Sequence, residues 1–258
     1  MGTAVDLALG LDPVRFAAAA GYPDLDDWQQ KVLRVKPRRL LLNCSRQVGK
    51  TLTAALLALH QAIYADGSLA VVVAVAQRQS QETVRICRDL YGTLGRPVPA
   101  ESENKLSLEL ENGSRILAVP STEQTIRGLA GVNLLVLDEA SRMPDSLYGA
   151  VLPFLATSNG ALALLSTPFG RRGFFFESYQ QRAEWYYVEA PATACARIPA
   201  SFLAEQRKKT NALLYAQEWE CQFNNSERGA FREEDIHAAI QEEEWSWNLA
   251  SYAQSWNK

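Results

Sequence analysis

The sequence predicts an α/β domain built on a central, mainly parallel sheet that helices flank on both faces. Short, continuous apolar runs recur along the chain, and segments with helical periodicity separate them. Such runs are typical of strands buried on both faces, as in parallel sheets. Two of the runs end in polar motifs, a Gly-Lys-Thr loop after the first and an Asp-Glu pair after a later one. Together they indicate a P-loop nucleoside triphosphatase (NTPase) of the type with an inserted strand and a catalytic glutamate.

The first part of the chain alternates regularly between helical and strand patterns. The helical segments are amphipathic or largely apolar, and the strands are continuous apolar runs. A short loop (SRQVGK) separates the first strand from the helix that follows it. The predicted elements are a helix over 26–35, a strand over 39–44, a helix over 51–65, a strand over 69–76 and a helix over 80–94 that Ser80 caps.

The second part continues the pattern after a hairpin. Two alternating runs over 105–120 surround Asn112-Gly113, a dipeptide that favours a tight hairpin turn. Two further buried strands are predicted over 132–140 and 161–168. The segment 199–223 has a helical pattern, and we expect it to act either as a lid or as a hinge.

Length and composition fit one globular domain with a short appendage. The chain has 258 residues, of which 47% are hydrophobic and 21% charged, and these are ordinary globular values. We expect a P-loop domain over 1–230 and a linker segment over 231–258. The net charge of -3 excludes a generally basic surface, so any contact with nucleic acid must be local.

Other sequence features argue against export, membrane insertion and zinc binding. The first residues (MGTAVDLALG) lack the basic and apolar regions of a secretion signal. The longest apolar run, 69–76, is too short to span a bilayer, so we expect no membrane partner. The four cysteines show no C-x-x-C spacing, which favours a reduced cytosolic protein without a zinc site.

The loop after the first strand (CSRQVGKT, 44–51) has most of a phosphate-binding pattern. Gly49, Lys50 and Thr51 match the second half of G-x-x-x-x-G-K-[ST], whereas Cys44 replaces the first glycine. Between a strand and a helix, backbone N–H groups and the helix dipole face an anion. The alternative is a tight strand–helix turn with an exposed lysine. The expected nucleotide-contacting residues are Ser45, Arg46, Gln47, Val48, Gly49, Lys50 and Thr51.

A second motif (VNLLVLDEA, 132–140) makes a chance match of the loop less probable. Its strand ends in Asp138 and Glu139. The aspartate suits the shell of Mg²⁺, and the glutamate suits the activation of an attacking water. Acids are also favoured at a helix N-terminus, which explains one of the two but not both. The two motifs together predict hydrolysis of a nucleoside triphosphate with Mg²⁺.

Three further sites fit such an enzyme, each with a simpler alternative. Ser166, Thr167 and Pro168 end a strand where a γ-phosphate sensor would lie, although a strand end followed by a turn also explains them. Gln29 lies where its amide could read adenine, while its neighbour Trp28 also fits the buried face of a helix. Arg127 occupies a glycine-rich segment from which it could reach a phosphate, although most loop arginines are simply solvated.

The combination of CSRQVGKT, IRGLAGVNLLVLDEAS and LLSTPFGRRGFF resembles the ATPase domain of the large terminase subunit of tailed bacteriophages, over roughly residues 20–231. The resemblance implies a motor that uses ATP and Mg²⁺ to package double-stranded DNA into a procapsid. It also implies a portal protein and a small terminase subunit as partners, and the cytoplasm of the infected bacterial host as its location. A homo-oligomeric ring is expected on assembly, with a monomer as the alternative in isolation.

The resemblance assigns roles to individual residues. Lys50 and Thr51 would hold phosphate and Mg²⁺, with Asp138 completing the metal shell and Glu139 as the catalytic carboxylate. Terminases resemble this chain in placing an arginine within the loop, so Arg46 would contact phosphate or the catalytic glutamate.

Other assignments follow from the same resemblance. Ser166, Thr167 and Pro168 match the motif that couples hydrolysis to motion, and Gln29 matches an adenine-reading glutamine. Arg127 matches an arginine that some family members insert into a neighbour's site, with Arg46 as its competitor for that role.

One departure from the family concerns the C-terminal part. Full terminases of this type continue into a nuclease domain with an acidic two-metal site. Here RGAFREEDI resembles the linker that leads into such a domain, and Glu242, Glu243 and Glu244 form a run that a solvated helix face explains. We therefore expect no nuclease activity in this chain.

Contact with DNA is the least specific expectation. The basic clusters are each most simply a solvated surface, and the best candidate is Arg171 with Arg172, directly after the coupling motif. Two other functions stay open. One is a helicase-like or recombination DNA-dependent ATPase, and the other is a nucleotide-dependent portal-docking module with little turnover.

Overall fold

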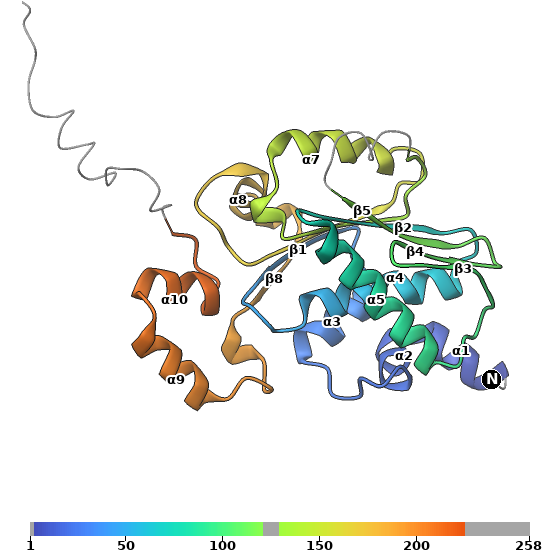
Figure 1. Cartoon of the computed structure of the whole chain (residues 1–258), viewed down its shortest axis with the longest axis horizontal. Helices are drawn as coiled ribbons and strands as arrows, with labels where there is room; N and C mark the ends of the chain where they lie inside the picture. Colours follow the sequence, from blue (N-terminus) through green and yellow to red (C-terminus); the bar gives the residue numbers. More distant parts are fainter. Residues whose placement is uncertain (1–2, 121–128, 225–258) are drawn as a thin grey trace, which may run out of the picture. The chain divides into compact units, whose positions relative to one another are not determined.

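The computed structural model of the chain describes residues 3–120 and 129–224 (Figure 1). The chain divides after Asn224 into two units, and only the first lies within the described residues. The expected domain boundary at residue 230 therefore stays a prediction. Arg127 and the Glu242–Glu244 run also lie outside the described residues.

The described residues form one eight-stranded sheet with the order β3-β4-β5-β2-β6-β7-β1-β8. The strands from β5 to β8 in this order are parallel, whereas β3 and β4 form an antiparallel extension. This confirms the predicted mainly parallel sheet. The strands are β1 (Arg39–Cys44), β2 (Leu69–Ala74), β3 (Ala100–Glu103), β4 (Ser107–Leu110), β5 (Arg115–Pro120), β6 (Leu134–Asp138), β7 (Ala161–Ser166) and β8 (Tyr186–Ala190).

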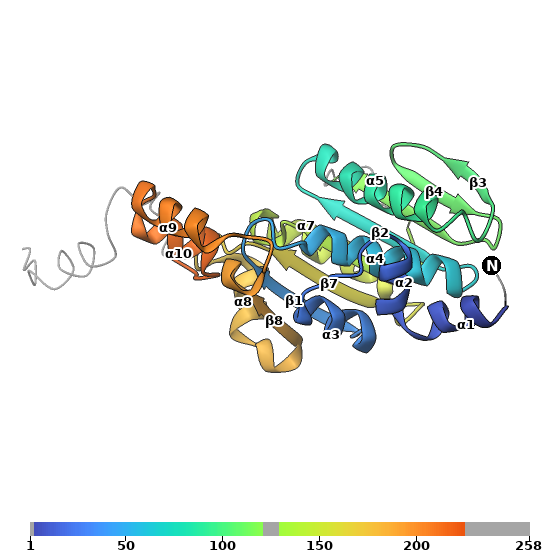
Figure 2. The same ribbon diagram turned by 90° about the horizontal axis from the view of Figure 1, so that it is seen from below.

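Helices cover both faces of the sheet, as Figures 1 and 2 show. The α-helices of the described residues are α1 (Thr3–Leu11), α2 (Pro13–Ala19), α3 (Asp27–Val35), α4 (Lys50–Tyr64), α5 (Gln77–Thr93), α7 (Asp145–Val151), α8 (Gly173–Gln180), α9 (Ala200–Lys209) and α10 (Ala212–Trp219). Short 3-10 turns are η1 (Ala140–Arg142), η2 (Leu152–Leu155), η3 (Arg182–Glu184) and η4 (Ala192–Ala194).

Side chains that alternate along each strand build two separate cores. Leu40 and Leu42 of β1 pack with α1 to α5 on one face, whereas Leu41 packs with α7, η2 and α8 on the other. The same alternation runs through β2, β6 and β7, because successive side chains of a strand point to opposite faces. Burial on both faces explains why these strands are continuous apolar runs.

The strand register brings the predicted motifs to one edge of the sheet. Asp138 at the end of β6 pairs with Leu165 of β7, and Asn43 of β1 pairs with Ser166. The carboxyl ends of β1, β6 and β7 therefore lie side by side, where parallel α/β sheets bind ligands. The strand between β1 and β6 is β7, whereas β2 lies on the far side of β6.

The helix predicted over 80–94 begins earlier, so its predicted cap is wrong. Helix α5 starts at Gln77, and strand β2 ends at Ala74. The Gln79 side chain accepts a hydrogen bond from the Ala76 backbone N–H (3.3 Å), which satisfies the helix start. Ser80 lies inside the helix, where its hydroxyl donates to the carbonyl of Gln77 (3.0 Å).

The hairpin and the C-terminal helical segment are confirmed, with additions. Strands β4 and β5 pair around the predicted turn, and β3 adds a further strand. The segment 199–223 forms two helices, because Asn211 caps α10 through the Leu213 N–H (2.8 Å). Within the part of the chain that the structure describes, no helix has the length and apolarity needed to cross a membrane.

His60 on α4 is a buried titratable group beneath the sheet. The residue is 3% exposed. Its Nε2 lies 3.2 Å from the Leu9 carbonyl, which accepts a hydrogen bond only if Nε2 carries the proton. The Lys36 ammonium therefore donates to Nδ1 at 3.3 Å. Burial, and next the Lys36 charge, lower the pKa of His60 to about 4.

This environment predicts acid sensitivity. An unfolded histidine binds its proton near its ordinary pKa of 6.5 and the folded one near 4, so between these values the unfolded state holds more protons. Stability then falls as pH decreases through this window, by up to about 3 kcal/mol from this residue. We expect wild type to lose that much more than His60→Gln in urea unfolding at about pH 7 and about pH 4. His237→Gln, which removes the other histidine, is the control, and equal losses in all three proteins would contradict the account.

Candidate active site

The loop between β1 and α4 has the strand–loop–helix arrangement that a phosphate-binding loop requires, although its first glycine is missing. Cys44 stays in the extended conformation of β1, pairs with Ala190 of β8 and is fully buried. Burial raises the pKa of its thiol to about 12, so Cys44 is a neutral packing residue. Gly49 is the position that requires glycine. Its φ is 96°, which strains other residues, and an added Cβ would lie 2.9 Å from the Gln29 amide nitrogen. The loop thus requires glycine at 49 and not at 44.

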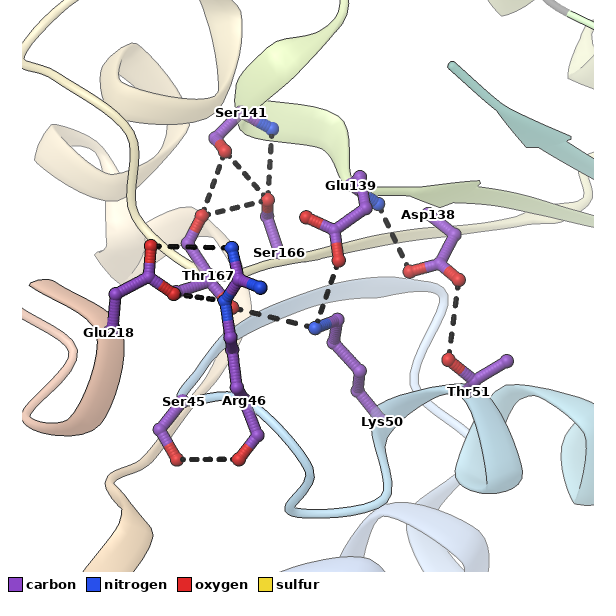
Figure 3. Close-up of polar contacts among 10 residues, drawn as sticks. All are labelled: Ser45, Arg46, Lys50, Thr51, Asp138, Glu139, Ser141, Ser166, Thr167 and Glu218. Atoms are coloured by element: carbon purple, nitrogen blue, oxygen red, sulfur yellow. Dashed lines mark hydrogen bonds and ion pairs between the residues drawn. The ribbon is translucent and has the colours of Figure 1, made fainter. Parts of the chain in front are cut away.

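Lys50 connects the loop to the residues that follow β6 and β7 (Figure 3). Its ammonium lies 3.1 Å from a carboxylate oxygen of Glu139 and 3.5 Å from the Thr167 hydroxyl. The Lys50 side chain is 11% exposed and the Glu139 side chain 20%, so the pair is shielded from water. Three residues predicted from separate motifs therefore meet at one point.

Thr51 and Asp138 form the second contact between the loop and β6. The Thr51 hydroxyl donates to Asp138 Oδ2 at 3.3 Å, and the Glu139 backbone N–H donates to Oδ1 at 3.0 Å (Figure 3). Burial raises the pKa of Asp138 to about 6, and the neighbouring Glu139 charge adds to the rise while Lys50 opposes it. A hydroxyl and a buried carboxylate are oxygen ligands of the kind that Mg²⁺ prefers, and a cation there would offset the cost of burying Asp138. The residues present therefore fit Mg²⁺.

The predicted coupling residues end β7 beside this site. Ser166, Thr167 and Pro168 are all buried. The Thr167 hydroxyl faces Lys50, whereas the Ser166 hydroxyl faces the η1 turn that follows Glu139 (Figure 3). The motif thus contacts both the loop and the strand that carries the acids.

Gln29 packs against the loop, and its amide group is fully engaged. Its oxygen accepts from the Asp26 backbone N–H at 3.1 Å, and its nitrogen donates to Thr53 (3.0 Å) and to the Gly49 carbonyl (3.4 Å). The side chain is fully buried. In this structure Gln29 supports the loop backbone, and adenine reading stays a prediction.

Arg46 has a different partner from the one expected. Its guanidinium forms an ion pair with Glu218 of α10 (Figure 3). Its backbone N–H donates to the Glu218 carbonyl at 3.1 Å. The expected contact with Glu139 is therefore absent in this structure, where Lys50 pairs with that carboxylate instead. The Arg46 side chain is 56% exposed, so a phosphate contact stays a prediction.

The remaining predicted residues lie around the loop or apart from it. Ser45 and Val48 are buried, and Gln47 is exposed with φ 61°. Arg171 and Arg172 are exposed, and the Arg171 Nε donates to the Phe223 carbonyl at 3.2 Å.

Three residues that the sequence did not single out also contact the site. Glu218 pairs with Arg46, and Ser141 contacts the end of β7. Arg197 pairs with Asp26 at 2.8 Å and donates to the Val48 carbonyl at 3.2 Å. Glu218 and Arg197 are single polar residues without a surrounding motif, and Ser141 ends the motif that carries Asp138 and Glu139. Only the three-dimensional arrangement reveals what these three residues contact.

Comparisons with known proteins agree with one another. A family model described as terminase large subunit, T4likevirus-type, N-terminal matches residues 41–238. No curated protein sequence gives a significant match. The large terminase ATPase domain of Thermus phage P74-26 is similar in structure, with a TM-score of 0.72 and 19% identity over 81% of this chain and 98% of that chain.

Two longer terminases are also similar. The HK97 bacteriophage large terminase has a TM-score of 0.65 and 16% identity, over 83% of this chain and 55% of that chain. The large terminase of the thermophilic bacteriophage D6E, in complex with ADP, has a TM-score of 0.63 and 11% identity, over 78% of this chain and 54% of that chain. This chain therefore spans about half the length of these two proteins.

The Arg46–Glu218 pair predicts an effect on nucleotide affinity. We expect Glu218→Gln to tighten ATP binding, because the Arg46 guanidinium is then free to contact a phosphate. An ion pair with a half-exposed arginine contributes up to ~1 kcal/mol, which corresponds to about fivefold in affinity. Titration with a fluorescent ATP analogue measures the change. Glu220→Gln is the matched control, because the Glu220 carboxylate pairs with Arg207, and an equal effect of both substitutions would contradict this role of Glu218.

Proposed function

Because the chain belongs to the family of terminase large subunits of the T4-like type, and is thus an ATPase of a DNA-packaging motor, we propose that the site at the carboxyl edge of β1, β6 and β7 hydrolyses ATP and drives double-stranded viral DNA into a procapsid. The observation that carries the proposal is the position of Lys50, in contact with both Glu139 and Thr167.

The loop and α4 bind the phosphates. The N–H groups of Ser45 and Arg46 already donate to the Ala190 and Glu218 carbonyls, so the phosphates would be bound by the backbone N–H groups of residues 47–51 at the N-terminus of α4. The helix dipole favours negative charge there. The Lys50 ammonium pairs with the β- and γ-phosphates in place of Glu139. The arrival of nucleotide therefore releases the Glu139 carboxylate.

Glu139 then orients the attacking water and accepts its proton. Its side chain is largely shielded from bulk water, which strengthens its interaction with a bound water. Thr51 and Asp138 would hold Mg²⁺, whose charge neutralises the phosphate oxygens when it is bound.

The end of β7 transmits the change in phosphate state. Thr167 loses its contact with Lys50 when Lys50 moves to the phosphates. Ser166 and Pro168 are the residues on either side of Thr167 in the chain. We assign the coupling of hydrolysis to motion to these three residues, because β7 lies between the loop strand and the strand that carries the acids.

Arginines complete the charge stabilisation of the transferred phosphoryl group. Arg46 reaches a phosphate once its pair with Glu218 opens, and Arg127 acts in the site of a neighbouring subunit. A planar guanidinium suits both roles, because it binds phosphate oxygens through two parallel hydrogen bonds. Gln29 reads adenine only if nucleotide binding rearranges its present hydrogen bonds.

The partners follow from the packaging role. Arg171 and Arg172, exposed just after the coupling motif, contact the phosphate backbone of double-stranded DNA without reading its bases. The motor assembles as a homo-oligomeric ring on a portal protein with a small terminase subunit, in the cytoplasm of the infected bacterial host.

Two other functions fit the site less well. A helicase-like or recombination ATPase shares the loop and the acids, but the family match favours packaging. A portal-docking module with little turnover would not need a carboxylate for hydrolysis, such as that of Glu139 at 3.1 Å from Lys50.

Mixing of two inactive variants tests the ring and the role of Arg127. Lys50→Ala removes the phosphate contact, and Arg127→Ala removes the arginine. We expect each alone to lose at least about a hundredfold in ATP turnover and a mixture to recover part of it, because a Lys50→Ala subunit still supplies Arg127 to its neighbour. Wild-type specific activity should also rise with protein concentration. Turnover that is independent of concentration, with no recovery on mixing, would place the whole site in one subunit and leave Arg46 as its arginine.

A further inference from the structure

Ser141 links the strand that carries the acids to the strand that carries the coupling residues. It lies in η1, two residues after Glu139, and its hydroxyl is 2.7 Å from the Ser166 hydroxyl and 2.8 Å from the Thr167 carbonyl (Figure 3). Its backbone N–H donates to the Ser166 hydroxyl at 3.2 Å. One residue thus makes three hydrogen bonds to the end of β7.

The Ser166 hydroxyl also lies 2.9 Å from the Thr167 carbonyl, so two hydroxyl protons serve three contacts. In the arrangement that uses all three contacts of Ser141, its hydroxyl donates to the Thr167 carbonyl. Ser166 then donates to the Ser141 hydroxyl and accepts from the Ser141 N–H. Ser166 is fully buried and Ser141 half-buried, so these bonds compete with little water.

The backbone at Glu139 depends on this anchor. Glu139 has φ 58°, a left-handed conformation that is costly for any residue except glycine and that persists only where the surroundings enforce it. The turn after it is closed by the Arg142 N–H to the Glu139 carbonyl (2.9 Å), and Ser141 at its centre fixes this turn to β7. Removal of the Ser141 hydroxyl therefore loosens the segment that aims the Glu139 carboxylate.

Thr167 is held from two sides by groups of the active site. Its carbonyl accepts from Ser141, and its side-chain hydroxyl accepts from Lys50 at 3.5 Å. A movement of Lys50 towards nucleotide releases one side of Thr167 and leaves the Ser141 side in place. Ser141 is then the contact that holds the Glu139 turn against the end of β7.

We propose that Ser141 is a positioning residue, which holds the Glu139 turn in its reactive conformation and joins it to the coupling strand. The proposal rests on the proposed ATPase function and adds a residue to it. Ser141 acts through Glu139 and Thr167, so its loss lowers the rate of the chemical step and leaves nucleotide binding nearly unchanged.

Steady-state ATP hydrolysis by a set of serine variants tests the proposal. We expect Ser141→Ala to lower kcat about tenfold with KM changed by less than about twofold, because a slightly misplaced carboxylate slows the reaction and not binding. Ser141→Thr keeps the hydroxyl and should restore most of the rate. Ser158→Ala is the matched control, since Ser158 is also half-buried and also donates to backbone carbonyls, at the opposite ends of β6 and β7.

A double-variant cycle separates this role from simple packing. Ser141 and Ser166 belong to one hydrogen-bonded ring, so Ser141→Ala with Ser166→Ala should be no slower than the slower single variant. Ser166→Ala also keeps the test valid should Ser141→Ala fail to fold. Three results would overturn the role of Ser141. The losses in kcat of the two single variants could multiply in the double variant, Ser141→Ala could have the kcat of wild type, or Ser158→Ala could lose as much as Ser141→Ala. A wild-type protein that binds ATP without turnover would instead overturn the proposed function.

Discussion

The Lys50 ammonium is the contact on which the rest of the site depends. It is the point where the Gly-Lys-Thr loop, the residues after the acid-bearing strand β6 and the proposed coupling residues after β7 meet, through Glu139 at 3.1 Å and Thr167 at 3.5 Å. A buried lysine needs a counter-charge, and Glu139 supplies it in this structure. Phosphate is a competing counter-charge, so in the proposed mechanism the cation that pairs with Glu139 in this structure releases that carboxylate when nucleotide binds.

The loop is also fixed from its other side by the last part of the described chain. The Ser45 N–H donates to the Ala190 carbonyl (2.9 Å), Arg46 pairs with Glu218, and the Val48 carbonyl accepts from Arg197 (3.2 Å). Figures 1 and 2 both show α9 and α10 beside the end of the sheet at which β1 finishes. A change in the loop would therefore reach α10 directly, through the Arg46–Glu218 contacts.

Patterns that repeat along the chain were predictable from the sequence, and isolated contacts were not. The buried strands and the meeting of Lys50, Thr51, Asp138 and Glu139 followed from apolar runs and from motifs that parallel strands bring to one edge. Strand β8 was missed because its five residues are not a continuous apolar run and show no regular alternation. The start of α5 was misplaced because the side chain that accepts from the Ala76 N–H is Gln79, and glutamine is not by itself a residue type that marks a helix start. Ser141, Arg197 and Glu218 act through distances between segments far apart in sequence, which no local pattern encodes.

The central claim is that Glu139 both competes with nucleotide for Lys50 and activates the attacking water. Parallel measurement of ATP affinity and turnover in Glu139→Gln tests both parts, because the neutral amide no longer holds Lys50 by charge and cannot accept a proton. The account predicts ATP binding as tight as wild type or tighter, together with a loss of at least about a hundredfold in turnover. Weaker ATP binding, or turnover close to that of wild type, would contradict it.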